Sequence, residues 1–447
     1  MKTKFGSMTL AGIMMAGLVA GCSSNASNND TKTAEGTKAP SNAATSTTPA
    51  PAAPAGKVTI QFWHSLGGKT GEYMQAMIDR FNASHPNIEV VGTFQGSYDA
   101  TSTKLQQSIA ANTAPDVTML ERASVQQYAD AEVLEDLTPF LKKSNMSADD
   151  FVPGLMGHST FNKKLVSLPF NRSTPIFYVN KDMLDSKGLK VPTNWDEMKQ
   201  VANALVEKNG SEYKRYGVTM VYDSWYILGM ISQAGGKFLN DDGKSLGFVD
   251  NGVGEKVFGF LKDMQSTGAL FYPPAENSGS IVGQMFLDGK VGMLYQSTGV
   301  MGTFNDAKFK VVTAFLPQDK NAATPTGGGN ITMLAQSKQK DAAWEFIRWA
   351  ETDPQGDQQF IIDTGYLPPT KKMVESQQIK DLWAKEPNRK IAYDQLKNAV
   401  DTNKSVVWPE LSKEFNAAMQ AILYDSKDIK STMANFKKEA DRILSAK

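Results

Sequence analysis

The strongest constraint on the fold is an alternation of two hydrophobic periods that begins at residue 58. The segment VTIQFW alternates apolar and polar residues, as a β-strand does, and GEYMQAMIDRFNASHP then places Tyr73, Met77 and Phe81 four residues apart, as an amphipathic helix does. A second strand, NIEVVGTF, a helix, TSTKLQQSIAAN, and a third strand, DVTML, follow in order. Strands that alternate with helices predict an α/β fold with mostly parallel sheets covered by helices on both faces.

Aromatic and hydrogen-bonding residues follow the predicted strands at the points where the strands end. Ligands of open α/β sheets bind beyond the carboxyl ends of the strands, so these residues are candidates for a binding site. They are Trp63 and His64 after the first strand, Tyr98 after the second, Glu121 after the third, Tyr222, Asp223 and Trp225 after GVTMV, and Ser297 after VGMLYQ. Taken singly, Trp63, Tyr98 and Trp225 also fit core positions, but their shared placement at strand ends favours a pocket.

The body of the chain, from Lys57 onward, is longer than a single hydrophobic core usually supports, so we expect two lobes. Over the whole chain, 47 Lys and Arg residues balance 47 Asp and Glu residues, which leaves no net field to recruit nucleic acid or an anionic membrane surface. The three histidines, His64, His85 and His158, lack the spacing of metal ligands, and the body contains no cysteine. We therefore expect neither a metal nor a cofactor.

The one cysteine, Cys22, stands where an apolar run ends near the N-terminus. A basic head, an apolar run too short to span a bilayer and the small residues VAG precede it, which is the order typical of bacterial lipoprotein signal peptides. We expect residues 1–21 to be removed and Cys22 to be lipidated. A buried thiol or a nucleophile is the alternative, but no base stands near Cys22 in the sequence. Residues 22–56 are rich in Ser, Thr, Asn, Ala and Pro, and this composition predicts a disordered tether.

Several motifs, in the same order along the body, resemble the family 1 extracellular solute-binding proteins of ABC importers. They are VTIQFWHSLGG, RFNASHPNIEV, GSY, APDV, LPFNRSTPIFYVNKDML, WDEM, MFLDGKVGMLYQSTG and TGYLPPTKK. The resemblance extends from about residue 57 to the C-terminus. Within the family, the sequence is most similar to the glycerol-3-phosphate-binding subgroup.

This resemblance implies a two-lobe periplasmic-binding-protein-like fold of class II, in which doubly wound sheets are joined by a hinge of several crossings. We expect residues 57–172 and 331–372 in lobe 1 and residues 173–330 and 373–447 in lobe 2. The segment PFNRSTPIFYVNKD corresponds to the first crossing and TGGGNITML to the second, and a third passage follows TGYLPPTKK. Glycines in the second crossing provide backbone freedom where the hinge must bend.

The resemblance also implies a set of ligand contacts. In this sequence they fall on Tyr98, Glu121, Ser173, Ser297, Gly329 and Tyr366, and the subgroup's two wall tryptophans fall on Tyr222 and Trp225. One position departs from the pattern. The subgroup's arginine that faces the phosphate is replaced by Ser412 in VVWPELSKEF, so a charge-assisted pair worth roughly 1.5–3 kcal/mol is missing for a phosphate ligand.

These features predict a lipoprotein, held at the outer face of the bacterial membrane by Cys22 alone, that binds a solute and delivers it to the transmembrane subunits of an ABC permease. The expected solute is a sugar, a glycerol phosphate or a glycerophosphodiester, and the expected state is a monomer. No chemistry is required: aromatic rings stack on C–H faces, and Glu121, Ser173 and Ser297 bond hydroxyl groups.

An extracytoplasmic glycan hydrolase is the alternative class. It would use Glu121 with Asp223 as the second carboxylate, but the sequence has no nucleophile elbow, zinc motif or phosphate loop to support it. The C-terminal region has Phe415, Met419 and Ile422 on one helical face and then a second apolar face at Met433, Phe436, Ala440 and Ile443. Packing against a lobe is the simpler interpretation of these helices, and a contact with the permease is the other.

Overall fold

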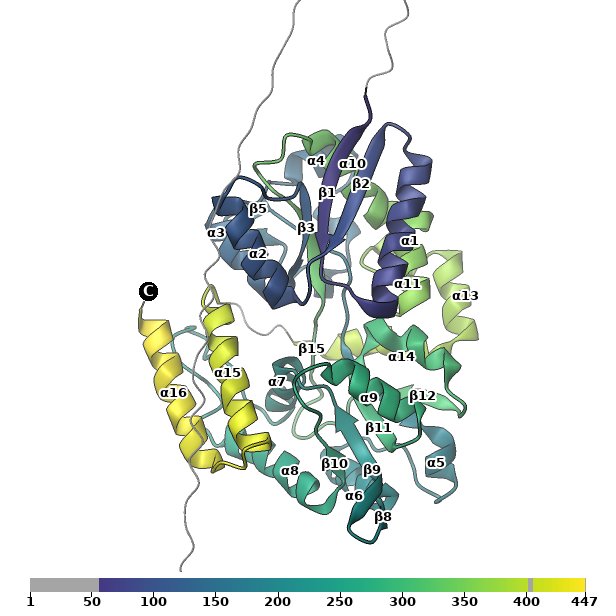
Figure 1. Ribbon diagram of the computed structural model, residues 1–447, viewed down its shortest axis with the longest axis vertical. Helices are drawn as coiled ribbons and strands as arrows, with labels where there is room; N and C mark the ends of the chain where they lie inside the picture. Colours follow the sequence, from purple (N-terminus) through teal and green to yellow (C-terminus); the bar gives the residue numbers. More distant parts are fainter. Residues whose placement is uncertain (1–55, 401–404, 447) are drawn as a thin grey trace, which may run out of the picture. The chain divides into compact units, whose positions relative to one another are not determined.

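The computed structural model of the protein describes residues 56–400 and 405–446. The predicted signal peptide, Cys22 and the tether up to residue 55 lie outside the described residues. The described chain contains two main sheets, each covered by helices (Figure 1).

The first sheet has the strand order β2-β1-β3-β14-β6. Strands β1 (Val58–His64), β2 (Ile88–Phe94) and β3 (Val117–Glu121) run parallel, whereas β14 (Gly329–Met333) runs antiparallel to β3 and to β6 (Leu168–Pro169). The three predicted strands are therefore present, and they follow one another along the chain as predicted.

The helices associated with the first sheet are α1 (Gly68–Ser84), α2 (Tyr98–Ala110), α3 (Val125–Asp130), α4 (Thr138–Lys143), α10 (Lys340–Thr352) and α11 (Gln359–Thr364). Helix α1 buries Met74, Met77, Ile78 and Phe81, because residues three and four apart share one helix face. The Phe81 ring meets the Phe346 ring of α10 edge-on at 5.2 Å, so the expected apolar face forms part of this lobe's core.

The second sheet has the order β10-β9-β11-β7-β12. Its strands are β7 (Pro175–Asn180), β9 (Glu212–Met220), β10 (Leu270–Phe271), β11 (Val291–Ser297) and β12 (Val311–Ala314), and β8 (Glu207–Asn209) pairs with β9. The accompanying helices are α5 (Lys181–Asp185), α6 (Trp195–Leu205), α7 (Ser224–Gln233), α8 (Val253–Thr267), α9 (Ser278–Leu287) and α14 (Pro387–Asp394).

The sheets are mostly parallel, as expected, but β14 in the first sheet and β7 and β8 in the second run against the other strands. Strands β9, β10 and β11 are parallel to one another, but β7 is antiparallel to both β11 and β12. In each sheet the antiparallel strand, β14 or β7, is one that the chain enters directly after crossing from the other lobe. Such a strand arrives from the opposite direction to a strand that follows a helical crossover within the lobe.

The crossings lie side by side. Ser173 and Gly327 exchange both backbone hydrogen bonds, at 3.2 and 2.7 Å, which pairs the segment between β6 and β7 with the segment before β14. The Leu367 N–H donates to the Arg172 carbonyl at 2.8 Å and brings a third stretch of chain to the same place. The lobe boundaries given above remain a prediction.

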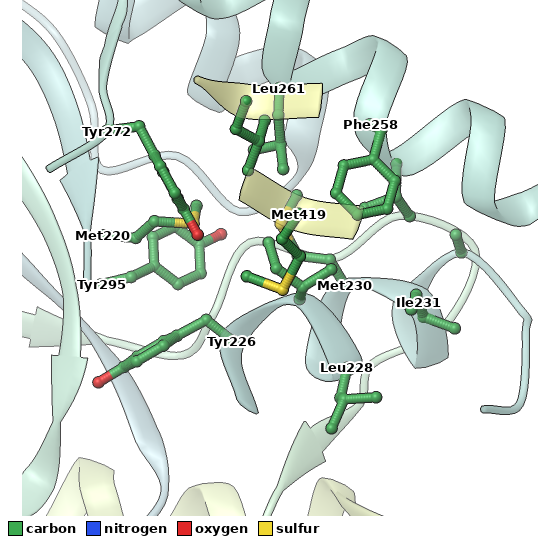
Figure 2. Close-up of a cluster of buried hydrophobic side chains, with 14 of the residues drawn as sticks. Met220, Tyr226, Leu228, Met230, Ile231, Phe258, Leu261, Tyr272, Tyr295 and Met419 are labelled. Carbon is green, nitrogen blue, oxygen red and sulfur yellow. The ribbon is translucent and has the colours of Figure 1, made fainter. Parts of the chain in front are cut away.

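Two long C-terminal helices, α15 (Trp408–Leu423) and α16 (Ile429–Ser445), run next to each other in Figure 1 and pack on the second lobe. Every residue of the two predicted apolar faces is buried in the core cluster of this lobe. Figure 2 shows Met419 of α15 beside Phe258 and Leu261 of α8 and Met230 of α7. Packing against a lobe is thus confirmed for these faces.

Short elements complete the described chain. They are the 3₁₀ turns η1 (Arg122–Ser124), η2 (Ala148–Asp150), η3 (Pro153–Leu155), η4 (Thr298–Asp306) and η6 (Gln395–Asn398), the π-helical turn η5 (Pro354–Gln358), helices α12 (Lys371–Val374) and α13 (Gln377–Lys385), and the strands β4 (Thr160–Phe161), β5 (Lys164–Leu165), β13 (Thr324–Pro325) and β15 (Ala399–Val400).

Candidate functional site

The strand ends that carry the predicted site residues are level with one another. In the first sheet His64 pairs with Phe94, so the loops that follow β1 and β2 leave the same edge. In the second sheet Tyr295 pairs with Met220 across parallel strands. Tyr222 and Ser297, each two residues further on, therefore leave one edge of that sheet together.

Asn171 connects three of the predicted residues. Its Nδ2 donates to the Tyr98 hydroxyl at 2.7 Å, its Oδ1 accepts from the Gly329 N–H at 3.0 Å, and its side chain partly offsets the rise that burial causes in the pKa of Tyr366. Burial raises the pKa of Tyr98 and of Tyr366, so both phenols stay protonated and keep a donor for a ligand. A Cβ at Gly329 would lie 2.8 Å from Asn171 Oδ1, which explains why glycine fits here.

The Tyr366 ring rests on the second lobe. A Cβ at Gly299 would lie 2.2 Å from this ring, so only glycine allows the observed approach. The Gly299 N–H donates to Ser297 Oγ at 3.1 Å, which places the Ser297 hydroxyl directly under the same turn. Tyr366 also stacks on Phe360, with ring centroids 5.6 Å apart.

Trp225 is fixed against the second crossing. Its Nε1 donates to the Thr326 carbonyl at 3.2 Å, and a Cβ at Gly327 would lie 2.4 Å from its ring. Since Ser173 pairs with Gly327, Trp225 and Ser173 meet the same short segment. Asp223 caps α7 by accepting from the Trp225 N–H at 2.8 Å, and the residue remains exposed to solvent.

Glu121 ends β3 and caps the turn that follows. Its Oε2 accepts from the N–H groups of Ala123 and Ser124 at 2.7 and 3.2 Å. Burial raises the pKa of Glu121, and the neighbouring Arg122 guanidinium opposes this rise. Glu121 and Asp223 are the two carboxylates of the alternative hydrolase hypothesis. Each of them caps a helical turn in this structure.

Two buried arginines bond the second crossing. Arg122 Nε donates to the Thr326 carbonyl at 2.6 Å, and Arg172 donates to Thr326 Oγ1 at 3.1 Å and to Asn330 Oδ1 at 2.9 Å. Both side chains are almost completely buried. These guanidinium groups stabilise the place where the lobes join.

Tyr222 and Ser412 lie on the second lobe. The Tyr222 hydroxyl donates to the Asn416 carbonyl of α15 at 2.9 Å, and its ring lies 5.6 Å from that of Tyr272. The Ser412 hydroxyl donates to the Pro409 carbonyl within α15 at 3.0 Å. The position expected to hold an arginine therefore presents a short, neutral side chain.

Trp63 and His64 pack within the first lobe. Trp63 lies against the apolar cluster that contains Leu105 and Tyr128. The His64 ring is buried between Phe62 and Phe94, at 5.8 and 6.1 Å, and burial lowers its pKa, which keeps the imidazole neutral. These contacts place both side chains in the core of the first lobe and away from the group around Asn171.

Sequence reasoning missed Asn171, and it did not foresee that aromatic rings contact Gly299 and Gly327. Asn171 stands in the motif LPFNRSTPIF, and a polar residue inside an apolar run is a signal for a buried hydrogen-bonding role. The two glycines carry no such signal, because the rings that approach them come from Trp225 and Tyr366, which are distant in the sequence.

Two cavities lie away from these residues. One of about 350 Å³ is bordered by Val191, Phe315 and Gln395, and another of about 210 Å³ by Tyr178 and Phe304. Neither is lined by a predicted binding residue, so the hydrogen bonds and ring contacts above define the candidate site. Within residues 56–400 and 405–446, no group of three metal-ligating residues occurs and no helix is long and apolar enough to cross a bilayer.

Comparison with solved structures defines the class of fold. An ABC substrate-binding protein from Listeria monocytogenes, solved with cycloalternan, matches with a TM-score of 0.78 and 22% identity over 87% of this chain and 99% of that one. UgpB from Mycobacterium tuberculosis, solved with glycerophosphocholine, matches with a TM-score of 0.78 and 24% sequence identity, over 88% of this chain and 99% of that one. The protein therefore has the two-lobe fold of substrate-binding proteins.

Comparison of sequences defines the family. Residues 76–387 match the family model described as bacterial extracellular solute-binding protein, and the chain belongs to this family. The sn-glycerol-3-phosphate-binding periplasmic protein UgpB of Escherichia coli O1:K1 / APEC is 25% identical over 362 residues, which are 76% of this chain and 81% of that protein. Membership places the protein among solute-binding proteins that act outside the cytoplasm.

Proposed function

We propose that the protein captures a sugar or a glycerol-phosphate-type solute between its two lobes and delivers it to the transmembrane subunits of an ABC permease. The observation that carries the proposal is the gathering of Tyr98, Tyr366 and Trp225 at the crossings, where each is positioned by a glycine from a distant part of the chain. The relatives that bind cycloalternan, glycerophosphocholine and glycerol-3-phosphate support a polyhydroxylated ligand.

The binding residues come from both lobes. Tyr98 and Glu121 follow strands of the first sheet, whereas Trp225 and Ser297 follow or end strands of the second. A solute that contacts both groups favours the closed arrangement of the lobes, which is the state that a permease recognises. We take the lobes to be residues 57–172 with 331–372 and residues 173–330 with 373–447. The protein acts as a monomer and is held at the membrane by lipidated Cys22.

Calorimetric titration of the full-length protein in detergent tests this proposal. The probes are sn-glycerol-3-phosphate, glycerophosphocholine, glucose, maltose and raffinose. We expect saturable binding of at least one probe and a loss of affinity in Tyr98→Ala, whereas Tyr73→Ala on α1 leaves binding unchanged. An absence of binding with every probe would contradict the proposed solute class.

Lipidation has a separate test. Cells that grow with a labelled fatty acid should incorporate the label into the wild-type protein and not into Cys22→Ala. Equal labelling of the two proteins would contradict lipidation of Cys22.

A further inference from the structure

We infer that the cavity bordered by Val191, Phe315 and Gln395 is a second ligand site, which takes a small aromatic carboxylate. The ring of the ligand enters the cavity, and its carboxylate pairs with Lys397 at the edge. None of the residues that line the cavity belongs to the candidate solute site, so the inference goes beyond the proposed function and does not depend on it.

The walls of the cavity come from four segments that are bonded to one another. The lining residues lie within 191–193, 314–318, 322–324 and 395–398. The Gln318 N–H donates to the Thr193 carbonyl at 3.0 Å and joins the first two segments. The buried Gln395 side chain joins the others, since its Oε1 accepts from the Leu316 N–H at 2.8 Å and its Nε2 donates to Thr324 Oγ1 at 3.3 Å. The cavity is therefore shaped before a ligand arrives, which favours binding.

The interior of the cavity is mostly apolar, and its size suits two fused rings. Pro192, Leu316 and Ala323 are buried lining residues, whereas Thr193 and Ala322 are exposed, so the cavity opens to solvent. An apolar cavity of about 150 Å³ holds one benzene molecule. The volume here is about 350 Å³, which leaves room for a bicyclic aromatic ring. Protein interiors contain few voids larger than a water molecule, so apolar space of this size indicates a place for a ligand.

Lys397 supplies a positive charge at the edge of the cavity. Its Nζ lies 4.8 Å from the centroid of the Phe315 ring, and within residues 56–400 and 405–446 it belongs to no ion pair. The side-chain amide of Asn398, another lining residue, has no hydrogen bond in the described part of the chain. The Glu197 carboxylate is engaged, because it accepts from the Thr193 N–H and hydroxyl at 2.8 and 2.9 Å. A ligand carboxylate can therefore pair with Lys397 and accept a hydrogen bond from Asn398.

The cavity adjoins the crossings through Gln395. Besides its bond to Thr324, Gln395 Nε2 donates to the Pro175 carbonyl at 2.6 Å, at the start of β7. Thr324 belongs to β13, which precedes the second crossing and pairs with β15. A ligand in the cavity therefore contacts a side chain that ties the first crossing to the second, and its binding should stabilise the folded protein.

Calorimetric titration of the full-length protein in detergent with indole-3-acetate and indole-3-ethanol tests the inference. The two probes share one bicyclic ring and differ in charge. We expect saturable binding of indole-3-acetate, and binding of indole-3-ethanol that is about fivefold weaker, because an ion pair at the edge of a cavity contributes modestly. Indole-3-acetate should also raise the thermal midpoint of unfolding.

Four variants separate this cavity from the solute site. Lys397→Met keeps an apolar stem and removes the charge, so it should bind both probes with equal affinity, whereas Lys430→Met on exposed α16 should retain the difference. Ala323→Phe fills the cavity and should abolish binding of both probes. Tyr98→Ala should weaken solute binding and leave probe binding unchanged. Circular dichroism confirms that each variant is folded, and Val191→Phe replaces Ala323→Phe if the latter is not.

Three results would overturn the inference, and none of them bears on the proposed function. An absence of indole-3-acetate binding removes the site. Equal binding of the two probes by the wild type, or an unchanged difference in Lys397→Met, removes the carboxylate from the assigned ligand. Probe binding that survives in the filled variant and is lost in Tyr98→Ala places the aromatic ring in the solute site instead.

Discussion

Replacement of Asn171 by alanine should destabilise the protein and weaken solute binding together. The side chain is 1% exposed and bonds the Tyr98 hydroxyl at 2.7 Å and the Gly329 N–H at 3.0 Å. Loss of the first bond costs about 1 kcal/mol, and the buried Gly329 N–H, left without an acceptor, costs about 1–3 kcal/mol more. We therefore expect the free energy of unfolding to fall by about 2–4 kcal/mol.

Urea denaturation followed by tryptophan fluorescence measures this change, and calorimetry measures the affinity. The matched control is Asn209→Ala on β8, where the side chain is exposed, and its effect should stay within about 0.5 kcal/mol. If Asn171→Ala unfolds at the same urea concentration as Asn209→Ala, the hydrogen bonds at the crossings do not hold the site as described.

Two other perturbations have defined outcomes. Gly327→Ala puts a Cβ 2.4 Å from the Trp225 ring and should weaken solute binding about tenfold, because it displaces that ring. Gly259→Ala is the control, since its Cβ meets open space, and it should leave the affinity unchanged. Equal calorimetric affinities for the two variants would refute this prediction. Glu351 and Asp357 are fully buried beside each other, and burial raises the pKa of both carboxyl groups well above the ordinary range. The protonated carboxyl groups therefore contribute their full stability below the unfolded pKa of about 4, and this contribution is lost as pH rises through the raised folded pKa. The thermal midpoint of the wild type should fall between pH 5 and pH 8, and the midpoint of Asp357→Asn should fall less over the same range. Parallel pH profiles for wild type and variant would exclude this pair as the cause.

The strands and helices of the body could be predicted because their signals are local. The spacing of Met77 and Phe81 placed α1, and alternation in VTIQFW placed β1. The positions of Tyr98 and Glu121 followed from the rule that parallel strands end at one edge. The direction of β7 and β14 could not be predicted in this way, because it depends on which lobe the chain has just left.

The sequence by itself determined the family, the α/β class and the aromatic residues at the strand ends, since hydrophobic period and motif order are properties of neighbouring residues. Only the tertiary structure decided which groups meet. Gly299 and Tyr366, or Gly327 and Trp225, are far apart in the chain, and the close approach of each ring to each glycine exists only after the crossings have paired. Contacts between distant segments depend on the packing of whole lobes, which no local pattern encodes.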